Sequence, residues 1–201
     1  MIQVPLKLLK CEVVKMERID LMDFLEKTIS SETIYRGKIL NLRVDSVELP
    51  NGKLASREVV EHSGAVAVVP LNEKNEVLLV RQYRYPVGKA LLEVPAGKIE
   101  KGEEPALCAE RELVEETGYE AEEIKHLFTF YSTPGFSDEK MYVYIARGLV
   151  YSGQKPDEDE FIQIVPVDLE KALSLIDEGE ICDAKSIVGL LAAKREMGKT
   201  T

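Results

Sequence analysis

The chain has 201 residues, and its 26 lysine and arginine residues against 36 aspartate and glutamate residues give a formal net charge of −10. Hydrophobic residues make up 45% and charged residues 31%, which is the composition of a globular protein and excludes disordered and collagenous chains. So acidic a surface argues against binding to nucleic acid and against docking on an anionic membrane. It favours a metal cofactor if the substrate is anionic, because two negative partners need a bridging cation.

The three cysteines, Cys11, Cys108 and Cys182, lie far apart and form neither a metal-binding spacing nor a disulfide framework. Reduced thiols are typical of the cytosol, so we expect a cytoplasmic protein. No apolar run approaches the roughly 18 residues that a membrane span needs. The N-terminal residues also lack the apolar stretch of a signal peptide.

The first predicted elements are strands. A hairpin is expected in residues 39–61, because apolar and polar side chains alternate and Asn51-Gly52 tolerates the positive φ of a tight turn. A second hairpin is predicted from strands 64–71 and 76–84, and the first of these is apolar enough to be central in a sheet. Further strands are expected over 91–94, 125–131, 140–147 and 161–167.

One helix is clearly marked at both ends. Residues 97–102 are expected to form a loop, Pro105 suits a first helical turn, and residues 106–117 run to Gly118, a good C-cap. Two further helices are predicted near the C-terminus, over 169–178 and 184–197. Strands, one helix, more strands and then helices indicate a mixed α/β or α+β sandwich and not a regular βαβ array.

The clearly marked helix carries a cluster of acidic residues. Glu112 and Glu116 are four residues apart and share a face, with Glu115 beside them. Like charges at this spacing destabilise a helix, and the C-terminal end of a helix disfavours anions. A bound divalent cation would explain both penalties, and carboxylate ligands suit Mg²⁺ or Mn²⁺. On the helix alone, a solvated acidic face paired with Arg111 explains the cluster equally well.

The residues around this helix form a longer pattern. In chain order it consists of Gly97, Glu103, Arg111, Glu112, Leu113, Glu115, Glu116, Gly118 and an apolar Tyr119. The pattern resembles the Nudix box in every defined position. By this resemblance the chain is identified as a member of the Nudix hydrolase superfamily, whose members cleave a nucleoside diphosphate linked to another moiety. The family fold is an α+β fold, an α/β/α sandwich with a mixed β-sheet between helices.

The resemblance also implies roles for the box residues. The implied metal ligands are two carboxylates and one backbone carbonyl, those of Glu112, Glu116 and Ala96. Glu115 would lie in or beside the metal coordination sphere, and Arg111 would orient Glu115 or Glu103 by a bidentate contact. The implied cofactor is Mg²⁺, with Mn²⁺ as a substitute.

Features outside the box resemble the ADP-ribose pyrophosphatase subgroup. Pro134 follows Gly118 by 16 residues, as is typical of that subgroup, although a Pro-Gly pair is also an ordinary turn. Residues 81–84, 92–97 and 137–139 are similar to it as well. The implied reaction is Mg²⁺-dependent hydrolysis of ADP-ribose to AMP and ribose 5-phosphate, with water attacking the pyrophosphate.

Two alternatives stay open at this point. One is a Nudix hydrolase of another nucleoside diphosphate sugar, such as GDP-mannose, because the walls of the pocket decide the substrate. The other is a sensor that binds ADP-ribose without cleaving it, although such regulators carry a degraded box and this box is intact. An appended DNA-binding domain, common in those regulators, also finds no room in 201 residues.

The subgroup further implies contacts to the substrate. The candidate residues are Arg57, Arg84, Pro134, Gly135 and Glu139. The two arginines would hold the anionic ligand, although charges on the surface of a strand are an ordinary alternative. Glu139 would reach the terminal ribose or its surroundings.

The base for hydrolysis is expected outside the box. Residues 157–160 read Asp-Glu-Asp-Glu, and such a run is ordinarily a solvated loop. The subgroup places a mobile acidic loop here, which implies that Glu158 is the general base and Glu160 a further metal ligand. The register stays open, because Asp157 and Asp159 lie one position away.

Two domains are expected: an N-terminal segment and hairpin over residues 1–61, and a Nudix hydrolase domain over residues 62–201. The subgroup is typically a homodimer in which the N-terminal strands complete the partner's pocket. We therefore expect a homodimer, with Arg57 reaching the neighbour's ligand. The other expected partner is a small nucleotide-sugar substrate, with no nucleic acid and no membrane.

Overall fold

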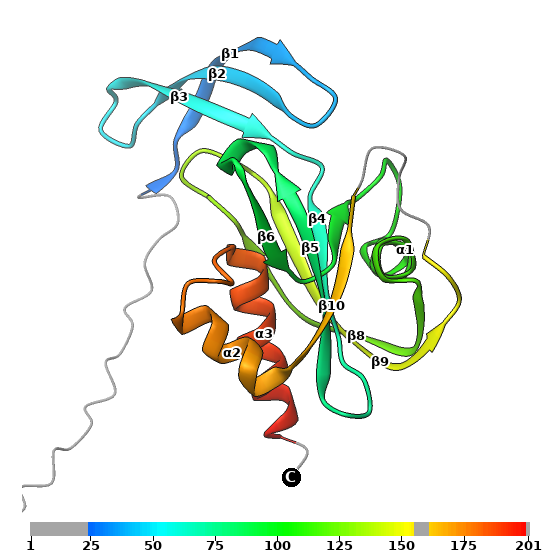
Figure 1. The fold of residues 1–201 in the computed structure, drawn as a ribbon. Coiled ribbons are helices and arrows are strands. Elements are labelled where there is room, and N and C mark those ends of the chain that lie inside the picture. Colours follow the sequence, from blue (N-terminus) through cyan, green and yellow to red (C-terminus); the bar gives the residue numbers. More distant parts are fainter. Residues whose placement is uncertain (1–23, 155–160, 200–201) are drawn as a thin grey trace, which may run out of the picture.

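The computed structural model describes residues 24–154 and 161–199. A layer of strands separates helix α1 on one side from helices α2 and α3 on the other, and an N-terminal sheet is set apart at one end (Figure 1). The helices are α1 (Pro105–Thr117), α2 (Leu169–Asp177) and α3 (Ala184–Met197). No helix within the described ranges has the length and apolar content needed to span a membrane.

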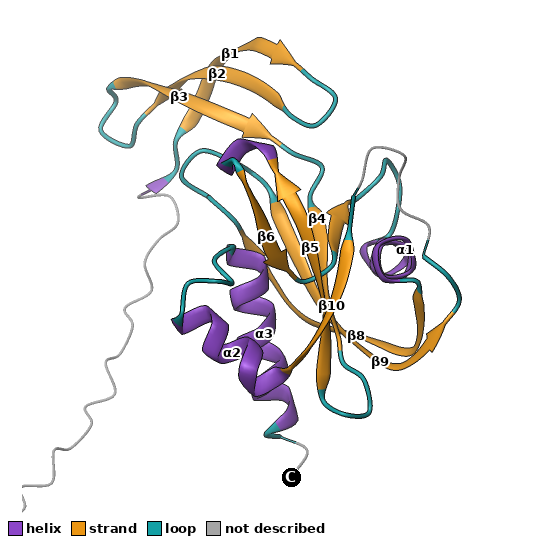
Figure 2. Ribbon diagram, in the orientation of Figure 1, coloured by secondary structure: helices purple, strands orange, loops and turns teal. Residues whose placement is uncertain are grey.

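The strands of the described residues form three sheets. The N-terminal sheet stands apart from the other strands in Figure 2. The N-terminal sheet contains β1 (Lys27–Arg36), β2 (Asn41–Glu48) and β3 (Leu54–Glu61) in that order. A second sheet has the order β10 (Gln163–Asp168), β5 (Glu76–Arg84) and β6 (Lys89–Glu93). The third has the order β7 (Ala96–Lys98), β4 (Ala65–Pro70), β9 (Lys140–Tyr151) and β8 (Tyr119–Tyr131).

Strand β4 is the centre of the fold, and all six of its residues are buried. Ala67 and Val69 belong to the core cluster that includes residues of α2 and α3. The alternate side chains, Val66 and Val68, pack in a second cluster with Leu113 of α1. A strand covered on both faces needs apolar residues at every position, which explains the continuous run. The predictions of a central strand and of a sandwich between helices are therefore confirmed.

The prediction of a second hairpin is wrong. Strand β4 pairs with β7 and β9, whereas β5 pairs with β10 and β6, so these consecutive strands belong to different sheets. A single bridge between Leu71 and Val77 connects them at the turn. Strand β4 and residues 77–80 of β5 are continuous apolar runs, and such runs carry no alternation from which a pairing partner could be read.

Several element boundaries also differ from the predictions, and β9 extends to Tyr151 beyond the predicted end at residue 147. Residues 96–98 form β7 against β4, so the expected loop starts after Lys98. Strand β8 begins at Tyr119 and not at residue 125. The prediction missed its first half because the glutamates there obscure the alternation of a strand. Strand β1 adds a third strand to the predicted N-terminal hairpin. By contrast, α1 and α3 lie where the sequence predicts them.

Candidate active site

Helix α1 carries the box residues, and its sequence determines both ends. Pro105 occupies the first turn, and Gly118 ends the helix in the left-handed conformation at φ 74°, with its N–H donating to the Val114 carbonyl at 2.8 Å. The apolar side of the helix packs on β4 through Leu113. Glu112 and Glu116 are nevertheless buried as well, with 8% and 2% of their surface exposed. Two buried carboxylates on one helix need cationic or hydrogen-bonding partners.

Arg111 supplies one such partner to three carboxylates. Its Nε and Nη2 donate to the two oxygens of Glu103 at 2.8 and 3.0 Å, which is the bidentate arrangement. Its Nη1 donates to Glu112 at 2.7 Å and to Glu115 at 2.8 Å. The hydrogen bonds with Glu103 raise the pKa of Arg111 and lower the pKa of Glu103 to about 2. Arg111 therefore holds Glu103 ionised and fixes the orientations of all three carboxylates.

Strand β7 lies directly against the two buried carboxylates. The Ala96 N–H donates to Glu116 Oε2 at 3.1 Å. A Cβ atom on Gly97 would lie 1.9 Å from the carboxyl carbon of Glu112, so only glycine leaves room for this side chain. The oxygen-rich surroundings of β7 and α1 match the donors that Mg²⁺ prefers. In the described part of the chain, no three histidine, cysteine or acidic side chains form a complete metal site.

Gly97→Ala is expected to lower kcat by about 10²-fold or more, because misplacing a catalytic group by about 1 Å costs that much. The three atoms nearest to the added methyl group all belong to the end of the Glu112 side chain, which can move, so the fold should survive. Steady-state kinetics and a thermal unfolding curve measure the two effects. Gly198→Ala is the matched control, since its Cβ would make only ordinary contacts. An active Gly97→Ala enzyme would contradict the role of Glu112.

Residues 152–154, which precede the acidic run in the sequence, are hydrogen-bonded to the C-terminal end of α1. The Gly118 carbonyl accepts the backbone N–H groups of Ser152 and Gly153 at 2.8 and 3.1 Å. The Gln154 side chain donates to the carbonyl of Glu116 at 2.6 Å. Residues 155–160 lie outside the described residues, and with them the predicted general base Glu158 and the predicted ligand Glu160. Their predicted roles stay predictions.

Arg84, at the end of β5, lies close to this site. It donates through Nε and Nη2 to Glu93, the last residue of β6, at 2.7 to 3.2 Å. These hydrogen bonds raise the pKa of Arg84, and the negative charges of Glu116 and Asp183 add to the effect. Arg84 is therefore within electrostatic reach of a buried carboxylate of the box. Its contact with the substrate stays a prediction.

The turn that carries Pro134 and Gly135 is tied to the N-terminal sheet. The Val60 N–H of β3 donates to the carbonyl of Phe136 at 2.8 Å. Glu139, after the turn, accepts a hydrogen bond from Ser132 and lies 3.6 Å from Nδ1 of His62. The sequence offers no motif that would single out His62, because it is 77 positions away from its partner along the chain.

Arg57 lies on β3 in the N-terminal sheet, and its Nε donates to Glu26 at 2.8 Å. Both side chains are partly exposed. The contact of Arg57 with a neighbouring subunit's ligand stays a prediction.

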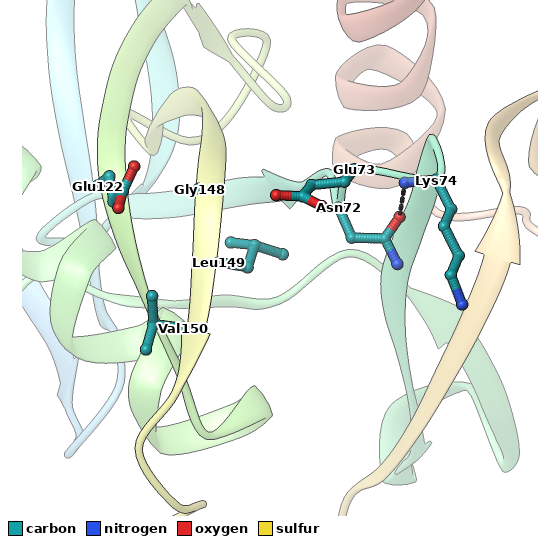
Figure 3. Close-up of a pocket in the computed structure, with 7 residues that line it drawn as sticks. All are labelled: Asn72, Glu73, Lys74, Glu122, Gly148, Leu149 and Val150. Carbon is teal, nitrogen blue, oxygen red and sulfur yellow. Dashed lines mark hydrogen bonds between the residues drawn. The ribbon is translucent and has the colours of Figure 1, made fainter.

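A separate hollow of about 320 Å³ lies between the β4–β5 turn and β9 (Figure 3). It is lined by Asn72, Glu73, Lys74, Glu122, Gly148, Leu149 and Val150. The Asn72 side chain accepts the backbone N–H of Lys74 at 2.9 Å and so shapes the turn. None of these residues belongs to α1 or to the predicted site, so this hollow is distinct from the candidate active site.

Comparison with known proteins identifies the class. The NUDIX domain family matches residues 61–188, and a nucleoside diphosphate sugar hydrolase N-terminal domain matches residues 26–60. The chain therefore belongs to the Nudix family of hydrolases, as the box predicts. A solved structure described as an ADP compounds hydrolase has the same fold, with a TM-score of 0.79 and 23% identity, covering 87% of this chain and 95% of that one.

Three relatives are similar over most of their length. An ADP-ribose pyrophosphatase of Bacillus subtilis is 47% identical, covering 80% of this chain and 88% of that protein. A methanol dehydrogenase activator of Bacillus methanolicus is 46% identical, covering 83% and 91%. An ADP-ribose pyrophosphatase of Mycobacterium tuberculosis is 41% identical, covering 83% and 82%.

Proposed function

We propose that this protein is a Mg²⁺-dependent ADP-ribose pyrophosphatase that hydrolyses ADP-ribose to AMP and ribose 5-phosphate. The observation that carries the proposal is the buried pair Glu112 and Glu116, held between Arg111 and strand β7. Burying two neighbouring carboxylates costs free energy, and a helix that only covers the surface gains nothing from it. A bound divalent cation would offset this cost, because it takes carboxylate oxygens as ligands. Two relatives at 47% and 41% identity bear the name of this activity.

Each part of the site has a task in this reaction. The metal would be held by the carboxylates of Glu112, Glu116 and Glu160 and by the backbone carbonyl of Ala96. When bound, Mg²⁺ neutralises charge that builds up on the diphosphate.

The remaining residues act on the substrate and the water. Arg111 fixes the carboxylates, so that no reorganisation is needed during the reaction. Arg84 holds the diphosphate, and the turn with Pro134, Gly135 and Glu139 holds the terminal ribose. Glu158 accepts the proton of the attacking water, with Glu115 beside the metal.

A substrate panel tests the proposal. ADP-ribose, GDP-mannose and other nucleoside diphosphate sugars are incubated with the enzyme, with Mg²⁺ or with EDTA, and the released nucleoside monophosphate is measured. We expect the highest kcat/KM for ADP-ribose, with AMP as the product and no turnover in EDTA. A higher kcat/KM for GDP-mannose would identify GDP-mannose as the substrate and leave the proposed type of reaction unchanged. Binding of ADP-ribose without any turnover would indicate a sensor.

The proposal includes a homodimer formed through the N-terminal sheet. All ten residues of β1 are exposed within one chain, including Ile29 and Ile34. Sedimentation at micromolar concentration should give twice the chain mass of 22.5 kDa. Ile34→Glu should yield monomers with impaired turnover, whereas Leu191→Glu on α3 should leave the dimer intact. A fully active wild-type monomer would contradict the proposal.

Domain boundaries and location belong to the same proposal. Residues 1–61 serve dimerisation and residues 62–201 serve hydrolysis. The free cysteines of the described residues, Cys108 and Cys182, are consistent with a cytosolic location.

A further inference from the structure

Glu93 is a buried carboxylate with cations from two different elements. Only 1% of its surface is exposed. Arg84 of β5 contacts it from one side, and Lys185 of α3 donates a hydrogen bond to Glu93 Oε2 from the other. Burial alone would raise the pKa of Glu93, but the two cations together hold it below its usual value. The carboxylate is therefore ionised and shared between two cations.

The two cations differ in their freedom to move. The Arg84 side chain is 35% exposed, whereas the Lys185 side chain is 15% exposed. Lys185 is also held by Asp183 Oδ2 at 2.9 Å. Asp183 is in turn fixed as the N-cap of α3, where it accepts the Ser186 N–H at 3.1 Å. Arg84 can therefore turn toward a ligand, whereas Lys185 is anchored.

A buried charge that loses its only partner is strongly destabilising. If Arg84 alone neutralised Glu93, each contact of Arg84 with an anionic ligand would leave this carboxylate unpaired. The anchored Lys185 removes that penalty, because Glu93 keeps a cation when Arg84 turns away.

We infer that Lys185 is a positioning residue for substrate binding, which keeps Glu93 paired so that Arg84 is available to the diphosphate. This inference rests on the proposed function, in which Arg84 holds the diphosphate. Lys185 itself acts through Glu93 and touches no substrate.

The same helix also supports the backbone on the way to the metal site. The Ser186 hydroxyl accepts the Val94 N–H at 2.8 Å, and Ser186 is fully buried. The segment between Glu93 and Ala96 is thus held by α3 at one end and by Glu116 at the other. A substitution that disturbed this support would lower kcat, whereas loss of the Lys185 charge alone should act on binding.

Binding without metal tests the inference apart from turnover. Calorimetric titrations in EDTA measure Kd for ADP-ribose and for inorganic pyrophosphate, which carries the diphosphate whatever nucleoside the enzyme prefers. Lys185→Met should weaken binding by about tenfold, within the range of coupling in one salt-bridge network. Lys185→Arg should restore it. With Mg²⁺, KM should rise while kcat stays within about threefold.

Two comparisons decide between positioning and other roles. Lys194→Met is the matched control, because Lys194 lies on the same helix in an exposed pair with Glu170 and should not affect Kd. In a Glu93→Gln background, Lys185→Met should change Kd by less than about twofold, because the carboxylate that it keeps paired is gone. This double variant also carries no unpaired Glu93 charge, so it keeps the test valid if the single variant unfolds.

The inference is overturned if Lys185→Met binds both probes as tightly as the wild type. It is also overturned if the loss is equally large in the Glu93→Gln background, since Lys185 would then act directly on the ligand or through packing. A wild type that binds but does not hydrolyse ADP-ribose contradicts the proposed function alone.

Discussion

Glu112→Gln is expected to lower kcat by about 10³-fold or more, because each tenfold corresponds to about 1.4 kcal/mol and metal ions contribute several kcal/mol to transition-state stabilisation. The substitution removes one negative charge from the proposed metal site. It keeps the size of a side chain that is packed against Gly97. The loss should therefore appear in metal affinity and turnover.

The fold should survive this substitution. Glutamine still offers an oxygen to Arg111 Nη1, which donates to Glu112 at 2.7 Å. The apolar side of α1, with Leu113 against β4, is unchanged. A thermal unfolding curve close to that of the wild type is the expected result.

Mn²⁺ binding by calorimetry, measured beside kcat, separates loss of the metal from loss of the fold. Glu110→Gln provides the control, because Glu110 is exposed on the same helix. It should match the wild type in both measurements. Normal turnover in a folded Glu112→Gln enzyme would refute the assignment of the box as a metal site.

Glu158→Gln is expected to lower kcat by about 10²–10⁴-fold, the usual contribution of general acid–base catalysis. KM should change little, because only the transition state uses the base. Glu158 lies outside the described residues, and the prediction rests on the acidic run and its resemblance to the subgroup's loop. The described alternatives, Glu115 and Glu139, already accept hydrogen bonds from Arg111 and Ser132.

The neighbours of Glu158 test the register of the run. Glu160→Gln should raise the Mg²⁺ concentration needed for activity, because it removes a proposed ligand. Asp157→Asn and Asp159→Asn should be mild. A Glu158→Gln enzyme within a few-fold of wild type, beside an inactive neighbour, would shift the register. Full activity in all four variants would place the base elsewhere, at Glu139 or Glu115.

The active-site helix could be predicted from the sequence because its determinants are local. Pro105 and Gly118 act within one turn of the helix ends. The four-residue spacing of Glu112 and Glu116 places both on one face, and the structure buries both. The chain-order pattern of the box adds Arg111, whose three carboxylate partners lie within eight residues of it.

Which distant segments of the chain meet depends on the packing of the whole molecule. Strands β4 and β5 are adjacent in sequence but belong to different sheets. The sequence does not reveal this, because the buried apolar runs of β4 and of residues 77–80 carry no alternation that indicates a pairing partner. Glu93 and Lys185 are 92 residues apart, and Lys185 belongs to no motif of the sequence. Their contact requires α3 to pack on the strand layer, which depends on the whole core and not on any local pattern. The pattern of residues along the chain therefore identifies the family and predicts the helix that carries the box, whereas the charge partners of Arg84 follow only from the packing of the chain.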